Sequence, residues 1–181
     1  MNRRILLVRH CQVGPEYQGL CYGQSDVELS SDGKEQSLQI AEQLAEWPIT
    51  HLFHSGLQRT SVPAELVASR AGVPAIADAD LRERNFGKWE LRSWNAIFAE
   101  VGRAMDGLVL NPAHYAPPDG ETTFALRDRV LAWYSRLPTH GLIVALTHGG
   151  PIAVLRGTLL GWTADRWPEL IPECGSITEM T

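Results

Sequence analysis

Two histidines stand directly after apolar segments that have the composition of buried strands. His10 follows residues 3–8, and His148 follows residues 142–147. An imidazole fixed in this way can attack phosphorus in line, because a covalent intermediate divides one difficult displacement into two easier steps. The glycines at 149–150 let the backbone approach an anion at the start of the next helix. The pattern predicts phosphoryl chemistry at a pair of strand ends.

Two arginines and two glutamates supply the other groups that this chemistry needs. Arg9 precedes the first histidine, and Arg59 lies where a helix follows residues 54–56. The planar guanidinium can bind two phosphoryl oxygens, and a bound anion would offset the unfavourable placement of a cation at a helix start. Glu83 and Glu90 both stand among aromatic residues, where partial desolvation suits a general acid that protonates a leaving alkoxide.

Each group also has an ordinary structural interpretation. A strand-end histidine can hydrogen-bond a loop, two glycines can make a tight turn, and exposed arginines and glutamates form weak ion pairs. The sequence excludes two other classes of enzyme. It has neither the C-x5-R signature of a cysteine phosphatase nor the GxxxxGK[ST] loop of a P-loop nucleotidase or kinase. His51 and His54 face opposite sides of a strand, so we expect no metal site from them.

The elements that position these residues alternate between strands and helices. Strands are expected at 3–8, 50–54, 142–147 and 176–181, and helices at 32–47, 57–71, 94–103, 122–137 and 151–160. Pro63 places the true start of the second helix near 60–62. This order predicts an α/β fold with a mostly parallel sheet and helices on both faces, in which ligands bind beyond the carboxyl ends of the strands.

Composition and charge narrow the class of protein. The chain has 181 residues, 44% of them hydrophobic and 20% charged, and a net charge of −5. This length fits one domain, and the acidic balance argues against nucleic-acid and membrane partners. With apolar stretches far too short to span a bilayer and three cysteines without a CxxC pair, we expect a cytoplasmic protein with reduced thiols. A homodimer is compatible with the pattern.

Four motifs occur in the order found in a known family. They are Leu-Val-Arg-His at 7–10, Ser-x-Leu-x-Arg at 55–59, the segment 81–90, and Thr-His-Gly-Gly at 147–150. Together they resemble the histidine phosphatase superfamily, also called the phosphoglycerate mutase-like family. The resemblance spans Leu7 to about Leu160. It implies one histidine phosphatase domain over 1–181, a three-layer α/β sandwich, and a phosphomonoesterase that needs neither a metal nor another cofactor.

The resemblance also implies a role for each residue. His10 would accept the phosphoryl group and Glu83 would donate the proton. Arg9, Arg59 and a protonated His148 would bind the phosphate and stabilise its developing charge.

The chain departs from the family pattern directly after the nucleophile. Residues 11–15, Cys-Gln-Val-Gly-Pro, replace the usual Gly-Glu-Thr and the downstream asparagine that often binds phosphate. We expect Gln24 or Ser25 to replace that asparagine. Cys11 raises the hypothesis that oxidation of its thiol inactivates the site.

Two further segments bear on the substrate. Residues 19–29 and 111–122 are similar to bacterial α-ribazole phosphatase-type members, which implies α-ribazole 5′-phosphate and cobalamin synthesis. The alternatives are a broad sugar-phosphate or nucleotide phosphatase and, from another class, a noncatalytic binder of phosphorylated ligands. The short chain disfavours a mutase. The aromatic residues that could face a base or ribazole, or simply fill the core, are Tyr22, Trp89, Trp94 and Tyr115.

Overall fold

The computed structural model describes residues 3–180. The strands are β1 (Arg4–Arg9), β2 (Leu20–Cys21), β3 (Ile49–His54), β4 (Ala75–Ala77), β5 (Arg92–Ser93), β6 (Leu142–Thr147) and β7 (Ile177–Met180). The α-helices are α1 (Ser31–Ala45), α2 (Gln58–Ala71), α3 (Trp94–Val101), α4 (Gly107–Leu110), α5 (Thr123–Arg136) and α6 (Gly149–Leu159). The 3₁₀ helices are η1 (Pro15–Tyr17), η2 (Ala79–Leu81), η3 (Gly87–Trp89), η4 (Gly102–Asp106) and η5 (Ala164–Leu170).

The central sheet has the strand order β4-β3-β6-β1-β7. All its neighbours are parallel except β7, which runs antiparallel to β1. The chain moves from β1 outward to β3 and β4 and then returns to β6, which leaves β1 and β6 side by side at the reversal of strand order. This reversal is where open α/β sheets bind ligands. The predicted α/β class with a mostly parallel sheet is confirmed.

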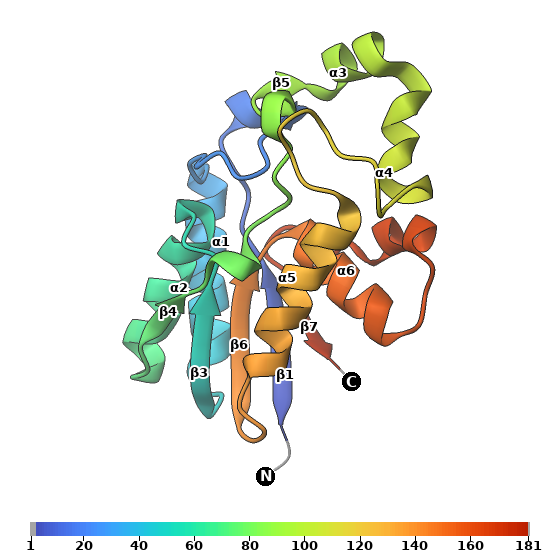
Figure 1. The fold of residues 1–181 in the computed structure, drawn as a ribbon. Helices are drawn as coiled ribbons and strands as arrows, with labels where there is room; N and C mark the ends of the chain where they lie inside the picture. The colour runs from blue at the N-terminus through green and yellow to red at the C-terminus, as the bar shows by residue number, and fades with distance from the viewer. Residues whose placement is uncertain (1–2, 181) are drawn as a thin grey trace.

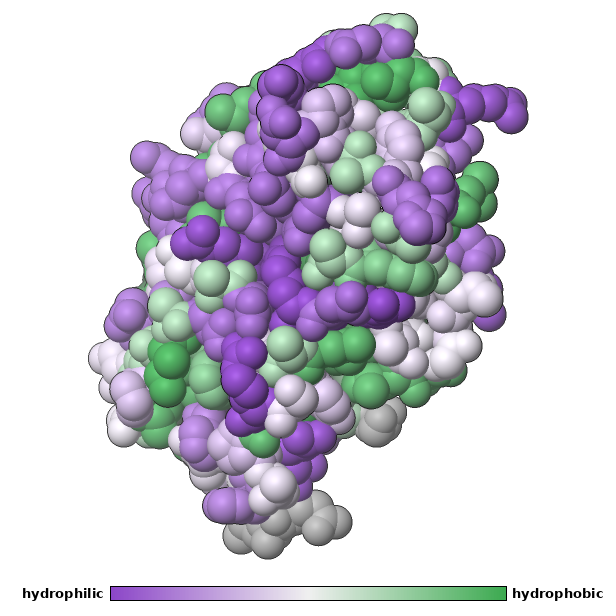
Figure 2. Space-filling model, in the orientation of Figure 1, coloured by the Kyte–Doolittle hydropathy of each residue, from purple (hydrophilic) through white to green (hydrophobic). Residues whose placement is uncertain are grey.

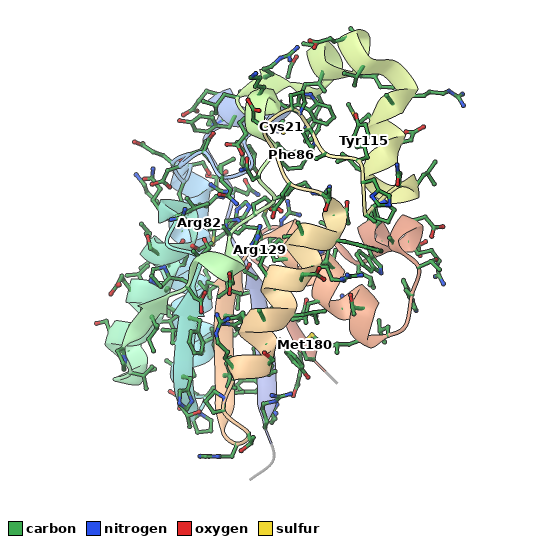
Figure 3. The ribbon with its side chains drawn as sticks, in the orientation of Figure 1. Cys21, Arg82, Phe86, Tyr115, Arg129 and Met180 are labelled. Carbon is green, nitrogen blue, oxygen red and sulfur yellow. The ribbon has the colours of Figure 1, made fainter. Side chains whose placement is uncertain are left out.

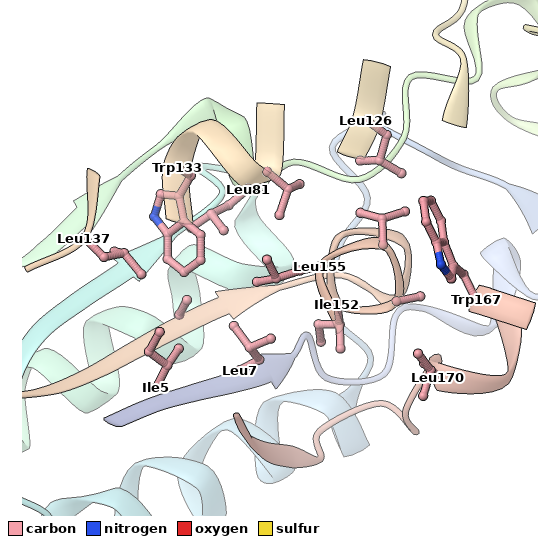
Figure 4. Packing of buried hydrophobic residues seen from close by; sticks show 14 of the residues in the cluster. Ile5, Leu7, Leu81, Leu126, Trp133, Leu137, Ile152, Leu155, Trp167 and Leu170 are labelled. Carbon is pink, nitrogen blue, oxygen red and sulfur yellow. The ribbon is translucent and has the colours of Figure 1, made fainter. Parts of the chain in front are cut away.

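Helices cover both faces of this sheet (Figure 1). Leu6 and Val8 face the cluster that contains α1 and α2 residues, whereas Ile5 and Leu7 face the cluster under α5 and α6. Figure 4 shows the second arrangement, with Ile5 and Leu7 beneath Trp133 and Leu155. Burial on both faces explains why β1 is an apolar run without alternation.

A third, smaller cluster lies beyond the carboxyl ends of the strands. We call residues Trp94–Leu110, which form α3, η4 and α4, the cap segment (top of Figure 1). Its side chains pack around buried Cys21, Trp89 and Ile97. Figure 2 shows hydrophilic residues over much of this face of the molecule, with hydrophobic residues in separate patches, one of them at the cap segment.

Several boundaries differ from the sequence predictions. Helix α2 begins at Gln58, before the predicted start, because Thr60 N and Ser61 N already donate to Leu57 O and form the first turn upstream of Pro63. The helix predicted at 94–103 ends at Val101 and continues as η4 and α4. Strands β2, β4 and β5 were not predicted, being two or three residues long. Of the last predicted strand, Thr181 lies outside the described residues.

No helix within residues 3–180 is long and apolar enough to cross a membrane.

Candidate active site

His10 lies at the carboxyl end of β1 with 2% of its surface exposed. Its backbone N–H donates to Thr147 O at 2.8 Å, which continues the pairing of β1 with β6. The ring Nδ1 lies 2.8 Å from the carbonyl oxygen of Cys11. A carbonyl only accepts, so Nδ1 carries the proton and the lone pair is left on Nε2. Burial and the nearby Arg59 guanidinium lower the pKa of His10 to about 3, so the neutral nucleophile prevails at physiological pH.

His148 lies beside His10, with the two ring centroids 5.2 Å apart. Its protonation follows from a chain of hydrogen bonds that ends on a carbonyl. The Thr60 hydroxyl donates to Leu57 O, so it accepts from the Ser55 hydroxyl at 2.8 Å. Ser55 Oγ therefore accepts from His148 Nε2 at 2.8 Å, and His148 Nδ1 accepts from Arg59 Nε at 3.2 Å.

This arrangement holds His148 as the neutral ring. Complete burial, the Arg59 guanidinium and His10 lower the pKa of His148 well below its usual range. Both ring nitrogens are engaged in this arrangement, which disfavours the expected protonated ring, and the binding of phosphoryl oxygens by His148 stays a prediction. In this structure His148 orients Arg59.

Arg59 is fully buried in the first turn of α2. Besides its bond to His148, it donates to Ser25 O at 2.8 Å and to Gly23 O at 2.5 Å. Three of its N–H groups are thus fixed by protein acceptors, and its fork keeps further hydrogens for a ligand. These contacts lock the guanidinium behind His10.

Arg9 ends β1 and lies against the start of α6 near Gly149. One terminal nitrogen donates to Pro172 O at 2.6 Å, while its buried Nε has no partner in the described part of the chain. A buried N–H without an acceptor costs free energy. An anion in front of β1 would supply that acceptor.

Glu83 reaches the site from the segment after η2. Its Oε1 accepts from Arg84 N at 2.8 Å, and its Oε2 accepts from Gly150 N at 3.2 Å, in the first turn of α6. A Cβ on residue 150 would collide with Oε1, so only glycine allows this approach. The backbone of Glu83 is held by Arg129, whose guanidinium donates to Glu83 O at 2.9 Å. Figure 3 shows Arg129 on α5 next to this segment.

The competing carboxylate, Glu90, has a different task. Its Oε1 accepts from Gln24 N and Phe86 N, and its Oε2 accepts from the Ser25 hydroxyl at 2.6 Å. Glu90 thus ties the loop at 22–25 to the segment that carries Glu83.

The two residues expected to replace the phosphate-binding asparagine are used elsewhere. The Gln24 side chain donates to Glu83 O at 2.9 Å, and the Ser25 side chain donates to Glu90. Neither residue lines the pocket described below. The structure therefore gives no support to Gln24 and Ser25 as phosphate ligands; they brace the loop whose carbonyls bind Arg59.

Cys11 is buried, and burial raises the pKa of its thiol. Ser37 Oγ donates to its sulfur at 3.4 Å. The thiolate is the reactive form, so this environment disfavours the predicted oxidation. Within residues 3–180, no group of three or more His, Cys, Asp or Glu residues is arranged to hold a metal ion.

A pocket of about 330 Å³ opens in front of His10. Its polar lining includes Arg9, Glu83 and Arg84, and its apolar lining includes Leu20, Phe86, Trp94 and Leu108, which we call the apolar wall. Of the four candidate aromatic residues, Tyr22 and Trp94 line the pocket, whereas Trp89 and Tyr115 belong to the third cluster. Figure 3 shows Cys21, Phe86 and Tyr115 close together beneath the cap segment.

The pocket concentrates positive charge in an acidic protein. In the described residues, no carboxylate lies within ion-pair distance of Arg9, Arg59 or Arg84. Sequence reasoning missed Arg84 and Ser55. In the sequence Arg84 is only one of several charged residues in the segment 81–90, and the bond from His148 to Ser55 joins residues 93 positions apart.

Comparison with known proteins agrees with this geometry. A profile of the histidine phosphatase superfamily (branch 1) matches residues 5–181. The glucosyl-3-phosphoglycerate phosphatase of Mycolicibacterium vanbaalenii is 33% identical over 93% of this chain and 79% of its own length. The probable phosphoglycerate mutase GpmB of Escherichia coli is 33% identical over 92% of this chain and 78% of its own.

Among solved structures, the α-ribazole phosphatase from Shigella flexneri has a TM-score of 0.85 and 25% identity, over 97% of this chain and 89% of that one. The profile covers nearly all of the chain, and its named relatives include phosphatases. The chain therefore is a phosphoric monoester hydrolase and belongs to the histidine phosphatase superfamily.

Proposed function

We propose that this enzyme hydrolyses its substrate through a phosphohistidine on His10, without a metal ion. Nε2 attacks phosphorus, the ester P–O bond breaks, and the leaving alkoxide takes a proton from Glu83. Water then attacks the phosphohistidine and gives a proton to Glu83, the P–N bond breaks, and inorganic phosphate leaves. His10 and Glu83 return to their starting states.

The state of His10 carries this proposal. Nδ1 is committed to Cys11 O, and the pKa of about 3 leaves the Nε2 lone pair free at neutral pH. The same hydrogen bond stabilises the positive charge that the ring gains when Nε2 bonds to phosphorus. A histidine serving only to brace a loop has no need for a neighbouring cation.

The remaining groups fit the charge changes of the reaction. Arg9 and Arg59 supply N–H donors to the equatorial oxygens, and His148 and two loop carbonyls keep Arg59 in place. Fixed donors of this kind stabilise developing charge without reorganisation during the reaction. Glu83 lines the same pocket as His10, which supports its assignment as the proton carrier for the leaving group.

For the substrate, α-ribazole 5′-phosphate in cobalamin synthesis is the first candidate. The apolar wall would accept its flat base, and the chain is similar in fold and sequence to a protein named α-ribazole phosphatase. Glucosyl-3-phosphoglycerate is the second, since a relative named for that activity is 33% identical. A broad sugar-phosphate or nucleotide phosphatase remains the third.

A panel of these phosphomonoesters, assayed by phosphate release with and without EDTA, tests the proposal. We expect turnover that EDTA does not change, with the highest kcat/KM for α-ribazole 5′-phosphate. The control is His51→Ala, a partly buried histidine on β3 that does not line the pocket, which should match the wild type. If ligands bind but no phosphate is released, the protein is a noncatalytic binder. Equal release by His10→Ala would overturn the role of His10.

A further inference from the structure

Arg84 is a buried cation without a partner. Only 9% of its surface is exposed, and its buried terminal nitrogen Nη1 has no hydrogen-bond acceptor in residues 3–180. Its guanidinium carbon lies 5.6 Å from the centre of the Phe86 ring, within range of a cation–π contact. That contact leaves the N–H groups unsatisfied, which costs free energy in a buried environment.

Arg129, on α5, is a nearby arginine whose contacts are all structural. It forms an ion pair with Glu121 and donates to the carbonyls of Asp80, Arg82 and Glu83. Removal of water from Arg129 is therefore compensated within the protein. The contrast indicates that the acceptor for Arg84 comes from outside the chain.

The position of Arg84 identifies where that acceptor lies. Arg84 lines the pocket in front of His10 and also a smaller recess of about 60 Å³, whose lining includes Val109, Ala153 and Trp167. In the proposed function Arg9, from β1, and Arg59, from α2, donate to the phosphate. Arg84 lines the same pocket as Phe86, and its guanidinium lies against the Phe86 ring, where it can meet the body of the ester.

We infer that Arg84 determines specificity by donating to an acceptor atom on the leaving group of the phosphate ester, whose body packs on the apolar wall of Leu20, Phe86, Trp94 and Leu108. This inference rests on the proposed phosphatase function and adds the substrate class. The preferred ester has a flat or apolar body that carries an oxygen or nitrogen acceptor.

A neutral acceptor is sufficient for Arg84. The buried atom that lacks a partner is Nη1, and a lone pair of a carbonyl oxygen, an ether oxygen or a ring nitrogen can accept from its N–H group.

Three aryl phosphates distinguish a neutral acceptor on the leaving group from an anionic one. Phenyl phosphate has no acceptor on its ring, 4-acetylphenyl phosphate has a neutral one, and 4-carboxyphenyl phosphate has an anionic one. Their kcat/KM values are measured for wild type, Arg84→Met and the control Arg136→Met, an exposed arginine near the end of α5. Comparing ratios between variants cancels the different intrinsic reactivities of the esters.

We expect the wild-type preference for 4-acetylphenyl over phenyl phosphate to fall about tenfold or more in Arg84→Met, as loss of a hydrogen bond to a charged group implies. Arg136→Met should keep the wild-type preference. Because removal of a buried, unpaired cation is not destabilising, Arg84→Met should also have at least the wild-type Tm.

An equal loss for all three esters, or no change in the preference, would overturn the inference. An effect confined to 4-carboxyphenyl phosphate would contradict the neutral acceptor. If the wild type hydrolysed none of the esters, the proposed function itself would fail, a result distinct from an unchanged preference.

Discussion

The floor and the wall of the pocket come from different parts of the chain. By the floor we mean His10, which lines the pocket after β1, together with the fully buried His148 and Arg59, which follow β6 and begin α2. Hydrogen bonds to each other and to backbone carbonyls fix these side chains. The wall comes from short elements and from the cap segment, which pack on a small cluster of their own. Reaction chemistry and substrate choice are therefore separable, and changes in each should have different signatures.

A substitution of Arg59 tests the role of the floor most directly. Arg59→Met removes the proposed donors to phosphate and leaves His148 and two carbonyls without their contacts to Arg59. We expect kcat/KM to fall about a thousandfold for every substrate, in the range found for loss of charge-stabilising donors. Steady-state kinetics on a good and a poor substrate measure this. Arg70→Met, in the last turn of the same helix, is the control, and a loss confined to one substrate would place Arg59 in the wall instead.

The proton carrier is tested at Gly150. In Gly150→Ala the new methyl group displaces Glu83, so we expect a loss of about a hundredfold for alkyl phosphates, which need a proton, and a smaller loss for 4-nitrophenyl phosphate, which does not. Gly157→Ala is the matched control on α6, because its methyl group meets Trp167 and should cost stability only. Equal losses for both substrates would argue against Glu83 as the acid.

The wall is tested at Leu108. Leu108→Ala removes apolar contact with the substrate. The KM for an aryl phosphate should therefore rise up to about tenfold, whereas the KM for a small alkyl phosphate should change little. Leu110→Ala, on the same short helix but 71% exposed, should behave as the wild type. A fall in kcat for both substrates would show that the wall cannot be separated from the floor.

The buried histidines of the floor should make the fold sensitive to acid. The unfolded chain protonates His10 near pH 6.5, whereas the folded protein resists protonation until about pH 3. The free energy of unfolding therefore falls as the pH drops below 6.5, by at most about 1.4 kcal/mol per pH unit for this group.

Urea denaturation at pH 7 and pH 5 measures this difference. His10→Gln should lose less stability over the interval than the wild type, whereas His51→Gln, at a partly buried position on β3, should follow the wild type. Identical losses in all three proteins would mean that the pKa of His10 is not lowered.

The floor was also the more predictable region. Apolar runs placed β1 and β6 as buried strands, and their ends brought His10 and His148 to one edge of the sheet. The neutral state of His148 could not be predicted, because it depends on Ser55 and Thr60 in another part of the chain.

The wall and its supports were less predictable for a physical reason. Gln24 and Ser25 find their partners in Glu83 and Glu90, about 60 residues away, across two irregular segments. No periodic pattern encodes such contacts. Arg84 likewise reads as a surface cation until the packing around it shows that it is buried.

The central claim is that His10 becomes phosphorylated during turnover, and rapid quenching with a ³²P-labelled substrate tests it most directly. We expect a transient, acid-labile and base-stable label on a peptide containing His10, absent in His10→Ala and present in His51→Ala. Phosphate release without such a label, or a label that persists in His10→Ala, would show that His10 is not the phosphoryl acceptor.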